Sequence, residues 1–227
     1  GLSVSPVGFT GHYGLSEGGF AHVSAAGGNF FFWEPPYHGM TRYFRAMTPA
    51  QRRTRVVMSG TMGWTKDELR ADLEHILTRL KLDTLPIYLI FWVRSPERMN
   101  PDVQGHLERL KDEGLIGTYG ISTHQRGLAL EALRLGWRLI MIRHNAAHRG
   151  IETSLLPAVQ ARDAALITFS NLCYGRLLNK THPQGLEPPT AADCYRYSLS
   201  QPGVTACLSA PQDPQQLREN LAGLRQP

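Results

Sequence analysis

Short apolar segments alternate with amphipathic segments along the whole chain, and this alternation limits the possible folds more than any other feature. The apolar segments are rich in β-branched and aromatic residues, which predicts strands buried on both faces of a sheet. Eight strands are expected, at Val7–His12, Asn29–Trp33, Arg55–Ser59, Ile87–Val93, Gly117–Ser122, Leu139–Arg143, Ala165–Ser170 and Val204–Leu208. Strands each followed by a helix predict an α/β fold, a (β/α)8 TIM barrel of minimal length, with a doubly wound sheet as the alternative.

The segments between the strands carry helix signals of their own. The clearest helix is Lys66–Leu82, which has one apolar stripe at helical spacing and a capping box formed by Thr65 and Glu68 at its start. Further helices are expected at Glu17–Ala26, Met40–Arg52, Asp102–Glu113, Arg126–Leu135, Thr153–Ala161 and Ala191–Leu199, and after Asp213-Pro214. The longest irregular stretch, Asn179–Pro189, is expected to be a surface loop within one domain, 1–227.

The composition is that of a globular protein, with 42% hydrophobic and 19% charged residues among 227. No apolar run approaches the roughly 20 residues that cross a bilayer, so no membrane partner is expected. Three cysteines, Cys173, Cys194 and Cys207, lie far apart and are odd in number, which argues against a disulfide framework and indicates a reducing cytoplasm. The net charge of +5 comes with scattered arginines and no recognised nucleic-acid module. It is compatible with an anionic small-molecule substrate, and it leaves the oligomeric state open.

Several motifs occur in the order and spacing of a known family. Gly27–Tyr37 reads as a strand that runs into a loop ending in tyrosine, and Leu77–Asp83 contains Leu-x-Arg-Leu before the expected fourth strand. Leu110–Ser122 ends in Gly-Ile-Ser, and Glu219-Asn220 lies in the last helix. Together these motifs make the chain resemble the aldo-keto reductases over nearly its whole length. The resemblance implies a barrel and NADP-dependent reduction of a carbonyl group.

The catalytic group of that family matches this sequence at one position of four. The family uses a tyrosine that protonates the carbonyl oxygen as hydride arrives, a lysine and an aspartate that lower the pKa of the tyrosine, and a histidine that orients the substrate. Tyr37 matches the tyrosine, but Phe32 stands at the aspartate, Thr61 at or next to the lysine, and Phe91 at the histidine. A tyrosine without a neighbouring cation is expected to keep a pKa of about 10 or higher.

The positions that the family uses for its cofactor are also altered. Met141 falls where a glutamine holds the nicotinamide amide, and Thr123 where an asparagine follows the signature serine. The expected loop Ser209–Gln212 lacks the basic residues that would hold a 2′-phosphate. The residues that the resemblance still places along a nucleotide groove are Ser122, Phe169, Glu219 and Asn220. We therefore expect a site that works without a cofactor, with NADP as the alternative.

Polar and aromatic residues are dense just after the expected strands, where the active face of a barrel lies. Glu34 follows Trp33, and if its carboxyl were buried its pKa would rise toward neutrality, as a general acid or base requires. The candidate catalytic residues are Tyr37, Glu34, His38 and His144. The candidate substrate-binding residues are Trp33, Phe32, Phe91, Trp92, Arg94, His124, Arg143, Asn145 and His12.

Each candidate also has a structural interpretation. Glu34 can be an exposed loop residue, His144 can satisfy a local hydrogen bond, and Asn145 can brace a loop. Trp33 and Trp92 can be packing residues. The histidines come from different strands without metal-ligand spacing, so no metal is expected.

These observations give one main hypothesis and two alternatives. The main hypothesis is an aldo-keto reductase-like barrel whose reworked site performs acid–base chemistry without net redox on a small carbonyl-type molecule: dehydration, cyclisation or isomerisation. A role in specialised metabolism, in a biosynthetic step, would fit. In the main hypothesis, Tyr37 moves a proton and Glu34, His38 or His144 is the base. Arg143 or Arg94 holds an anionic group. The alternatives are an NADP-dependent carbonyl oxidoreductase with compensating residues and a non-catalytic barrel that binds a ligand or partner.

Overall fold

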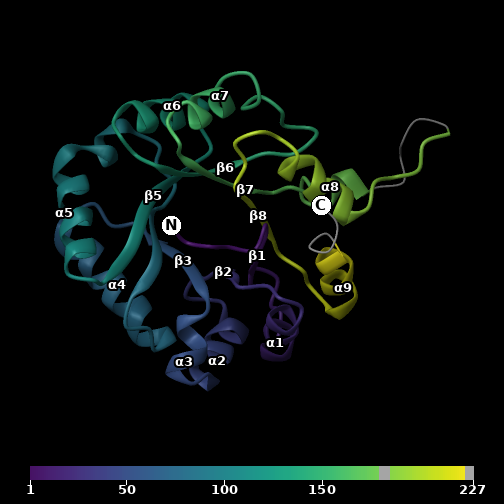
Figure 1. The fold of residues 1–227 in the computed structure, drawn as a ribbon, viewed down its shortest axis with the longest axis horizontal. Coiled ribbons are helices and arrows are strands. Elements are labelled where there is room, and N and C mark those ends of the chain that lie inside the picture. Colours follow the sequence, from purple (N-terminus) through teal and green to yellow (C-terminus); the bar gives the residue numbers. More distant parts are fainter. Residues whose placement is uncertain (179–184, 223–227) are drawn as a thin grey trace.

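Eight parallel strands close into one barrel in this computed structural model, which describes residues 1–178 and 185–222 (Figure 1). Each strand pairs with the next along the chain, and the last closes the ring against the first, with Val7 opposite Cys207. The strands are β1 (Val7–Thr10), β2 (Phe30–Phe32), β3 (Val56–Thr61), β4 (Leu85–Ile90), β5 (Ile116–Thr123), β6 (Leu139–Arg143), β7 (Ala165–Phe169) and β8 (Ala206–Ser209). The predicted (β/α)8 barrel is confirmed, and closure excludes the doubly wound sheet.

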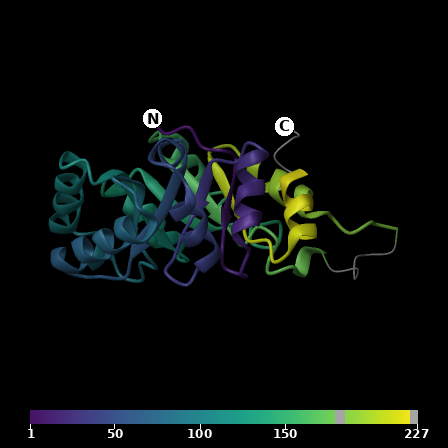
Figure 2. The same cartoon turned by 90° about the horizontal axis from the view of Figure 1, so that it is seen from below.

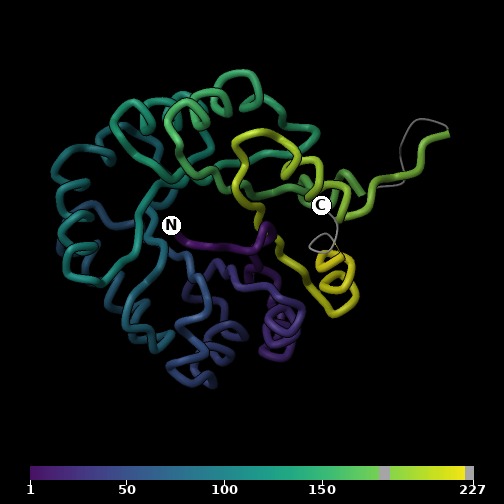
Figure 3. Tube along the Cα trace, viewed as in Figure 1, coloured from purple at the N-terminus to yellow at the C-terminus, as the bar shows by residue number. Residues whose placement is uncertain are grey.

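Helices form an outer layer around the strands, and the chain passes round the ring in sequence order (Figures 1 and 3). Seen from below, the molecule is flatter than it is wide (Figure 2). The helices are α1 (Glu17–Ala25), α2 (His38–Ala46), α3 (Pro49–Arg53), α4 (Lys66–Leu80), α5 (Pro101–Asp112), α6 (Arg126–Arg134), α7 (Leu155–Gln160), α8 (Ala191–Leu199) and α9 (Pro214–Ala222), with short 3-10 helices η1 (Pro96–Met99) and η2 (Arg176–Leu178). Crossing a bilayer would take a longer and more apolar helix than any in the described part of the chain.

Helix α4 forms as its sequence predicts. Thr65 and Glu68 make the expected capping box, and the predicted stripe of four leucines and Ile76 is buried. The helix packs on β3 and β4, and each buried side chain contributes roughly 1.5–3 kcal/mol to stability. This packing fixes the positions of β3, which ends at Thr61, and β4, which ends just before Phe91.

One expected helix, Met40–Arg52, is two helices in the structure. Helix α2 ends before Met47, and α3 begins anew at Pro49 with Thr48 as its N-cap. The correction has a simple cause: proline lacks the amide hydrogen that would continue α2, whereas its fixed φ suits a first helical position. The expected loop Asn179–Pro189 lies partly outside the described residues, which omit 179–184.

The fourth strand ends earlier than predicted. Strand β4 stops at Ile90 and does not extend to Val93. Trp92 takes a left-handed backbone conformation with φ of 48°, which a strand does not accommodate. The chain therefore leaves the barrel at Phe91 and enters the loop that leads to η1.

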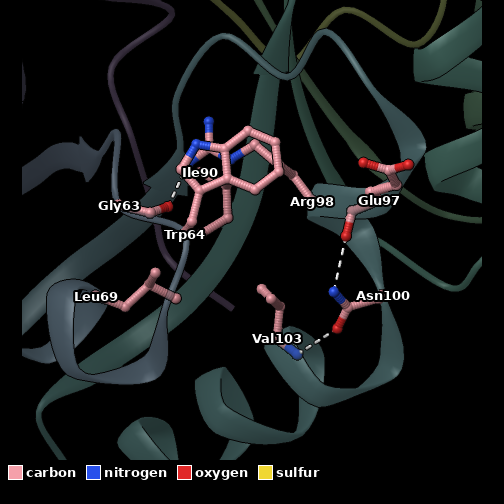
Figure 4. A pocket seen from close by; sticks show the side chains of 8 residues that line it. All are labelled: Gly63, Trp64, Leu69, Ile90, Glu97, Arg98, Asn100 and Val103. Carbon is pink, nitrogen blue, oxygen red and sulfur yellow. Dashed lines mark hydrogen bonds between the residues drawn. The ribbon is translucent and has the colours of Figure 1, made fainter.

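Arg98 ties the loops after β3 and β4 together at the carboxyl end of the barrel. Its side chain is buried, its Nη1 donates to the carbonyl of Phe91 at 2.7 Å, and its Nη2 donates to the carbonyl of Gly63 at 2.6 Å. The guanidinium lies 5.0 Å from the centre of the Trp64 ring, in the arrangement that Figure 4 shows. One buried cation thus holds two loops in register.

We predict that Arg98→Met lowers the free energy of unfolding by about 2–3 kcal/mol, because two carbonyl groups lose a charged donor. Urea unfolding followed by circular dichroism measures the change. Arg94→Met, which removes an exposed arginine from the same loop, is the control and should change stability by about 0.5 kcal/mol or less. Equal stability of the two variants would contradict the role given to Arg98.

Candidate active site

A tyrosine and a glutamate form a hydrogen-bonded pair where the chain leaves β2. The Tyr37 hydroxyl donates to Oε2 of Glu34 at 2.7 Å. The turn between them is closed by the Tyr37 amide, which donates to the Glu34 carbonyl at 3.0 Å. Tyr37 is 6% exposed, whereas Glu34 is only partly buried. The pair therefore joins a covered hydroxyl to a carboxylate that solvent can reach.

The surroundings of Tyr37 keep its hydroxyl protonated. Burial raises the pKa of Tyr37 above its usual value of 10.0, the Thr10 hydroxyl lowers it, and the charge of Glu34 and the hydrogen bond to it raise it further. The net shift is upward. The groups that act on the hydroxyl are thus a hydroxyl and a carboxylate, and neither is a cation. Tyr37 can hand on a proton, but it is not poised as a tyrosinate.

Aromatic side chains cover one side of the pair. The rings of Phe32 and Phe91 meet edge to face with centroids 5.7 Å apart, and Phe32 lies 6.4 Å from the Tyr37 ring. The His12 ring is also 6.4 Å from Tyr37, at a nearly perpendicular angle. Gly11 makes room for Tyr37, because a Cβ there would lie 2.8 Å from the Cβ of Tyr37. The structure therefore brings together the rings of Phe32, Phe91, His12 and Tyr37.

Thr61 occupies the position where the resemblance expects the lysine. Its side chain is buried, and its hydroxyl donates to Oδ2 of Asp72 at 2.5 Å and accepts from the Gly63 amide at 2.8 Å. Both of these contacts lie within the β3–α4 segment. The Thr61 hydroxyl therefore has a structural role, since it stabilises the segment that joins β3 to α4.

Two predicted site residues point into the core. Trp33 is fully buried, and its Nε1 donates to the Thr41 hydroxyl at 2.9 Å, so it packs beneath α2 and does not line the mouth. Asn145 is also fully buried, its Nδ2 donates to the Ser170 carbonyl, and its Oδ1 accepts from the Ala147 amide. The bracing role that the sequence left open for Asn145 is the one that the structure supports.

His144 is not available as a base, contrary to the first hypothesis for it. The side chain is fully buried, with Nδ1 3.0 Å from the Ser198 hydroxyl and Nε2 2.9 Å from Oε1 of Glu152. Its ring stacks on Tyr197 at 5.6 Å. Both ring nitrogens are occupied, so His144 fastens the loop after β6 to α8. His38, by contrast, is exposed at the first position of α2.

A second group of predicted residues gathers at the ends of β4 to β7. The rings of His124 and Phe169 meet edge to face at 5.1 Å, and Arg143 pairs with Phe169 in the β6–β7 register. Partial burial lowers the pKa of His124, and the charges of Arg143 and Arg94 lower it further. Positive charge therefore concentrates on this side of the mouth.

Trp92 and Ser122 contact each other between the two groups. Trp92 is 49% exposed, and its backbone amide donates to the Ser122 hydroxyl at 2.9 Å. The exposed indole is open to a ligand at the mouth, whereas the Ser122 side chain is buried and holds the β4 loop.

The residues at the expected cofactor positions do not fit NADP bound in the manner of the family. Met141 neighbours Ser122 in the β5–β6 register, and its thioether cannot form the paired hydrogen bonds that a carboxamide needs. At the start of α9 the backbone N–H groups of Gln215 and Gln216 already donate to the Asp213 carboxylate. A phosphate there would meet a negative charge.

Glu219 and Asn220, two of the residues expected along a nucleotide groove, also form hydrogen bonds within the protein. Asn220 is buried, and its Nδ2 donates to the Ser209 hydroxyl at 2.9 Å. The Glu219 carboxylate accepts from the Gln215 amide nitrogen Nε2 at 3.0 Å. Asn220 is therefore a residue that joins α9 to β8 and not an open cofactor contact. Among the described residues, no cluster of three or more histidine, cysteine, aspartate or glutamate side chains is placed to hold a metal ion.

Three contributors to this region were not among the predicted site residues. Thr10 acts on the Tyr37 hydroxyl, Arg98 holds the loops beside Phe91, and Glu152 anchors His144. Thr10 is the last residue of β1 and lies two residues before the predicted site residue His12. Its place at the end of a strand could have marked it as a site residue. Nothing in the sequence marks Arg98 or Glu152, because both depend on contacts between distant loops.

Comparisons with known proteins place these features in a family. Residues 52–193, more than half of the chain, match the model of the aldo/keto reductase family. No curated protein sequence matches the chain significantly. A Pseudomonas aeruginosa protein assigned to the aldo-keto reductases is similar in structure, with a TM-score of 0.79 and 24% identity over 99% of this chain and 92% of that one.

Two further solved structures have the same architecture. An aldo-keto reductase from Bacillus halodurans in its holo form has a TM-score of 0.82 and 19% identity, and the match covers 100% of this chain and 88% of that one. A glycerol dehydrogenase from Gluconobacter oxydans has a TM-score of 0.77 and 18% identity, with 98% and 87% covered. At these identities the structures establish the shared fold alone.

Glu152 carries a pH dependence that can be tested. Burial raises the pKa of Glu152, but hydrogen bonds from Tyr197, His144 and Arg149 outweigh burial and lower the pKa from 4.5 to about 2. A carboxylate whose pKa is lower in the folded protein stabilises the fold above its unfolded pKa. This stabilisation is lost as the pH falls from about 4.5 toward 2.

We predict that Glu152→Gln lowers the free energy of unfolding at pH 7 by about 1–3 kcal/mol, because charged hydrogen bonds become neutral ones. The difference from the unmodified protein should shrink as the pH falls below 4.5. Chemical unfolding at a series of pH values measures it, with the exposed Glu97→Gln as control. A difference that does not change with pH would contradict the network.

Proposed function

Because the chain belongs to the aldo/keto reductase family, we propose that it uses the family's barrel for acid–base chemistry on a small carbonyl-type molecule, without hydride transfer. Dehydration, cyclisation and isomerisation next to a carbonyl are the reactions of this class. The hydrogen bond of 2.7 Å between Tyr37 and Glu34 at the barrel mouth carries the proposal. Phe32, Thr61 and Phe91, at the positions of the other three catalytic residues, support it.

Tyr37 acts as a proton relay in this mechanism. As the Tyr37 oxygen takes a proton from a carbon or hydroxyl group of the substrate, its own proton passes to Oε2 of Glu34. The raised pKa of Tyr37 disfavours a free tyrosinate, so the two transfers are coupled. The proton then returns from Glu34 through Tyr37 to a different substrate atom or to a leaving hydroxyl. No electrons are exchanged with a second molecule.

The aromatic floor supports this chemistry. Phe32 and Phe91 are buried and meet at 5.7 Å, so they exclude water from one side of the Tyr37 hydroxyl. Exclusion of water strengthens the influence of Glu34 on the relay. We also propose that Glu34, which is only partly buried, exchanges its proton with solvent between turnovers.

Carbonyl reduction with NADPH is the second candidate function, favoured by family membership and by the retained Tyr37. It needs a cation that lowers the pKa of the tyrosine. Thr61, at the expected lysine position, is uncharged, and the buried Arg98 guanidinium already bonds to two backbone carbonyls. This is why acid–base chemistry without a cofactor is preferred.

The setting of the reaction is also a proposal. We propose a small-molecule substrate with an anionic group, in keeping with the arginines near His124. The cytoplasm is the proposed compartment, because Cys173, Cys194 and Cys207 are all free thiols. A place in biosynthesis would fit an enzyme that rearranges a carbonyl compound.

We predict that the protein catalyses exchange of solvent deuterium into the carbon next to a carbonyl, because the relay moves a proton to and from that carbon. A panel of 2-keto acids, 3-keto acids and hydroxyketones in deuterium oxide, followed by proton NMR without any nicotinamide, measures it. Tyr37→Phe should slow the exchange by about 10²–10⁴-fold. Glu34→Gln should slow it as well, since an amide cannot take up the proton.

The matched control is Tyr174→Phe, which removes the hydroxyl of an exposed tyrosine. It should exchange deuterium as fast as the unmodified protein. Exchange that is equally fast in Tyr37→Phe and Tyr174→Phe would refute the relay. Absence of exchange together with consumption of NADPH would favour the second candidate.

A further inference from the structure

A cavity of about 160 Å³ opens at the carboxyl ends of β5 and β6, beneath the starts of the segments that lead into α6 and α7. His124, Arg126, Arg143 and His148 line it, together with two isoleucines and a glycine. None of these described lining residues is acidic. Taking about 30 Å³ for each water, the cavity holds roughly five waters, enough for a carboxylate or phosphate group.

Arg143 is the central group of this cavity. It is the last residue of β6 and is half-buried, yet its guanidinium has no hydrogen bond or ion pair within residues 1–178 and 185–222. A partly desolvated charge without a partner is unfavourable. A guanidinium offers planar, paired N–H donors that match an oxyanion. Binding an anion would satisfy this arginine.

Two other lining residues are held in place by hydrogen bonds. Nη1 of Arg126 donates to the Gly150 carbonyl at 2.8 Å. Oδ1 of Asn145 already accepts from the Ala147 amide, so Nδ1 of His148, 3.1 Å away, carries a hydrogen and donates to it. This hydrogen bond fixes the His148 ring in the wall of the cavity. Groups fixed before binding lose little entropy when an anion arrives.

His124 is a titratable group in the wall of the cavity. Its ring stands against Phe169, and its side chain makes no hydrogen bond within the described residues. Partial burial of the ring lowers the pKa of His124 below 6.5. The positive charges of Arg143 and Arg94 lower it further. A bound anion would offset these positive charges and favour the protonated ring.

We propose that this cavity binds a carboxylate or phosphate group of the substrate, with the guanidinium of Arg143 as the main contact and His124 as an additional donor. The assignment to a substrate rests on the proposed function, whereas binding of the anion itself does not. Strand β6 lies across the barrel from β2. A molecule anchored at Arg143 would have to cross the mouth to reach Tyr37.

Calorimetric titration with two probe anions tests the inference. Sulfate is tetrahedral, like a phosphate group, and acetate is planar, like a carboxylate. Their charges stay constant between pH 6 and pH 8, so any pH dependence of binding arises from the protein. We expect at least one of them to bind, and Arg143→Gln to weaken that binding by about tenfold or more. The preferred probe identifies the class of anionic group.

The matched control is Arg109→Gln, which removes one positive charge from the exposed side of α5 and should leave binding unchanged. Binding should also be tighter at pH 6 than at pH 8, and the His124 signals in NMR should report a higher pKa when the anion is present. His124→Gln should remove most of the pH dependence. Because His124 is exposed, His124→Gln should fold, and it therefore tests the site even if Arg143→Gln does not fold.

Two results would overturn the inference. One is that neither anion binds, and the other is that Arg143→Gln and His124→Gln bind as the Arg109→Gln control does. The outcome is separable from the proposed relay, because Tyr37→Phe should bind the probe anion normally. If the anion binds but no deuterium exchange occurs, the relay fails and the anion site stands. If exchange depends on Tyr37 and no anion binds, the reverse holds.

Discussion

Closure of eight parallel strands into one ring determines the rest of this structure. Because every strand runs in the same direction, all the loops that follow the strands meet at one face. The pairing of β8 with β1 completes this ring. Residues as distant in sequence as His12, Tyr37, Phe91 and Arg143 therefore surround one opening. The chemistry of the protein is decided by which side chains those loops carry.

The replacements at this opening are physically consistent with one another. A lysine beside a covered tyrosine needs an acidic partner, since a covered cation without one is unfavourable. The resemblance assigns Thr61 and Phe32 to the lysine and aspartate positions, so neither the cation nor its partner is present there. Phe32 and Phe91 then pack against each other. The Tyr37 hydroxyl donates a short hydrogen bond to Glu34, and this contact is the basis of the proposed relay.

The sequence predicts the barrel well because its signals are local. Each strand is a short apolar run, and the stripe and capping box of α4 lie within one segment. The positions of Phe32 and Phe91 at the ends of β2 and β4 were also predictable from motif spacing, although β3 lies between these two strands. The division of Met40–Arg52 into α2 and α3 was not predicted, although Thr48 and Pro49 signal it.

The orientation of the site residues was harder to predict. Trp33 follows Phe32 directly, yet it turns into the core toward Thr41. His144 follows Arg143, and it is buried between Ser198 and Glu152 while its neighbour faces the cavity. One residue along a strand exchanges the two faces, so small shifts at strand ends decide which side chains reach the mouth. The contact between Tyr37 and Glu34 depends likewise on a turn whose geometry the sequence does not specify.

Calorimetric titration of the purified protein with NADPH distinguishes proton transfer from hydride transfer. We predict no binding at NADPH concentrations where working reductases are saturated, because Met141 cannot hold the nicotinamide amide and Asp213 places a negative charge where a phosphate would bind. Micromolar binding would contradict it. The barrel would then be a reductase whose compensating groups lie elsewhere at its mouth.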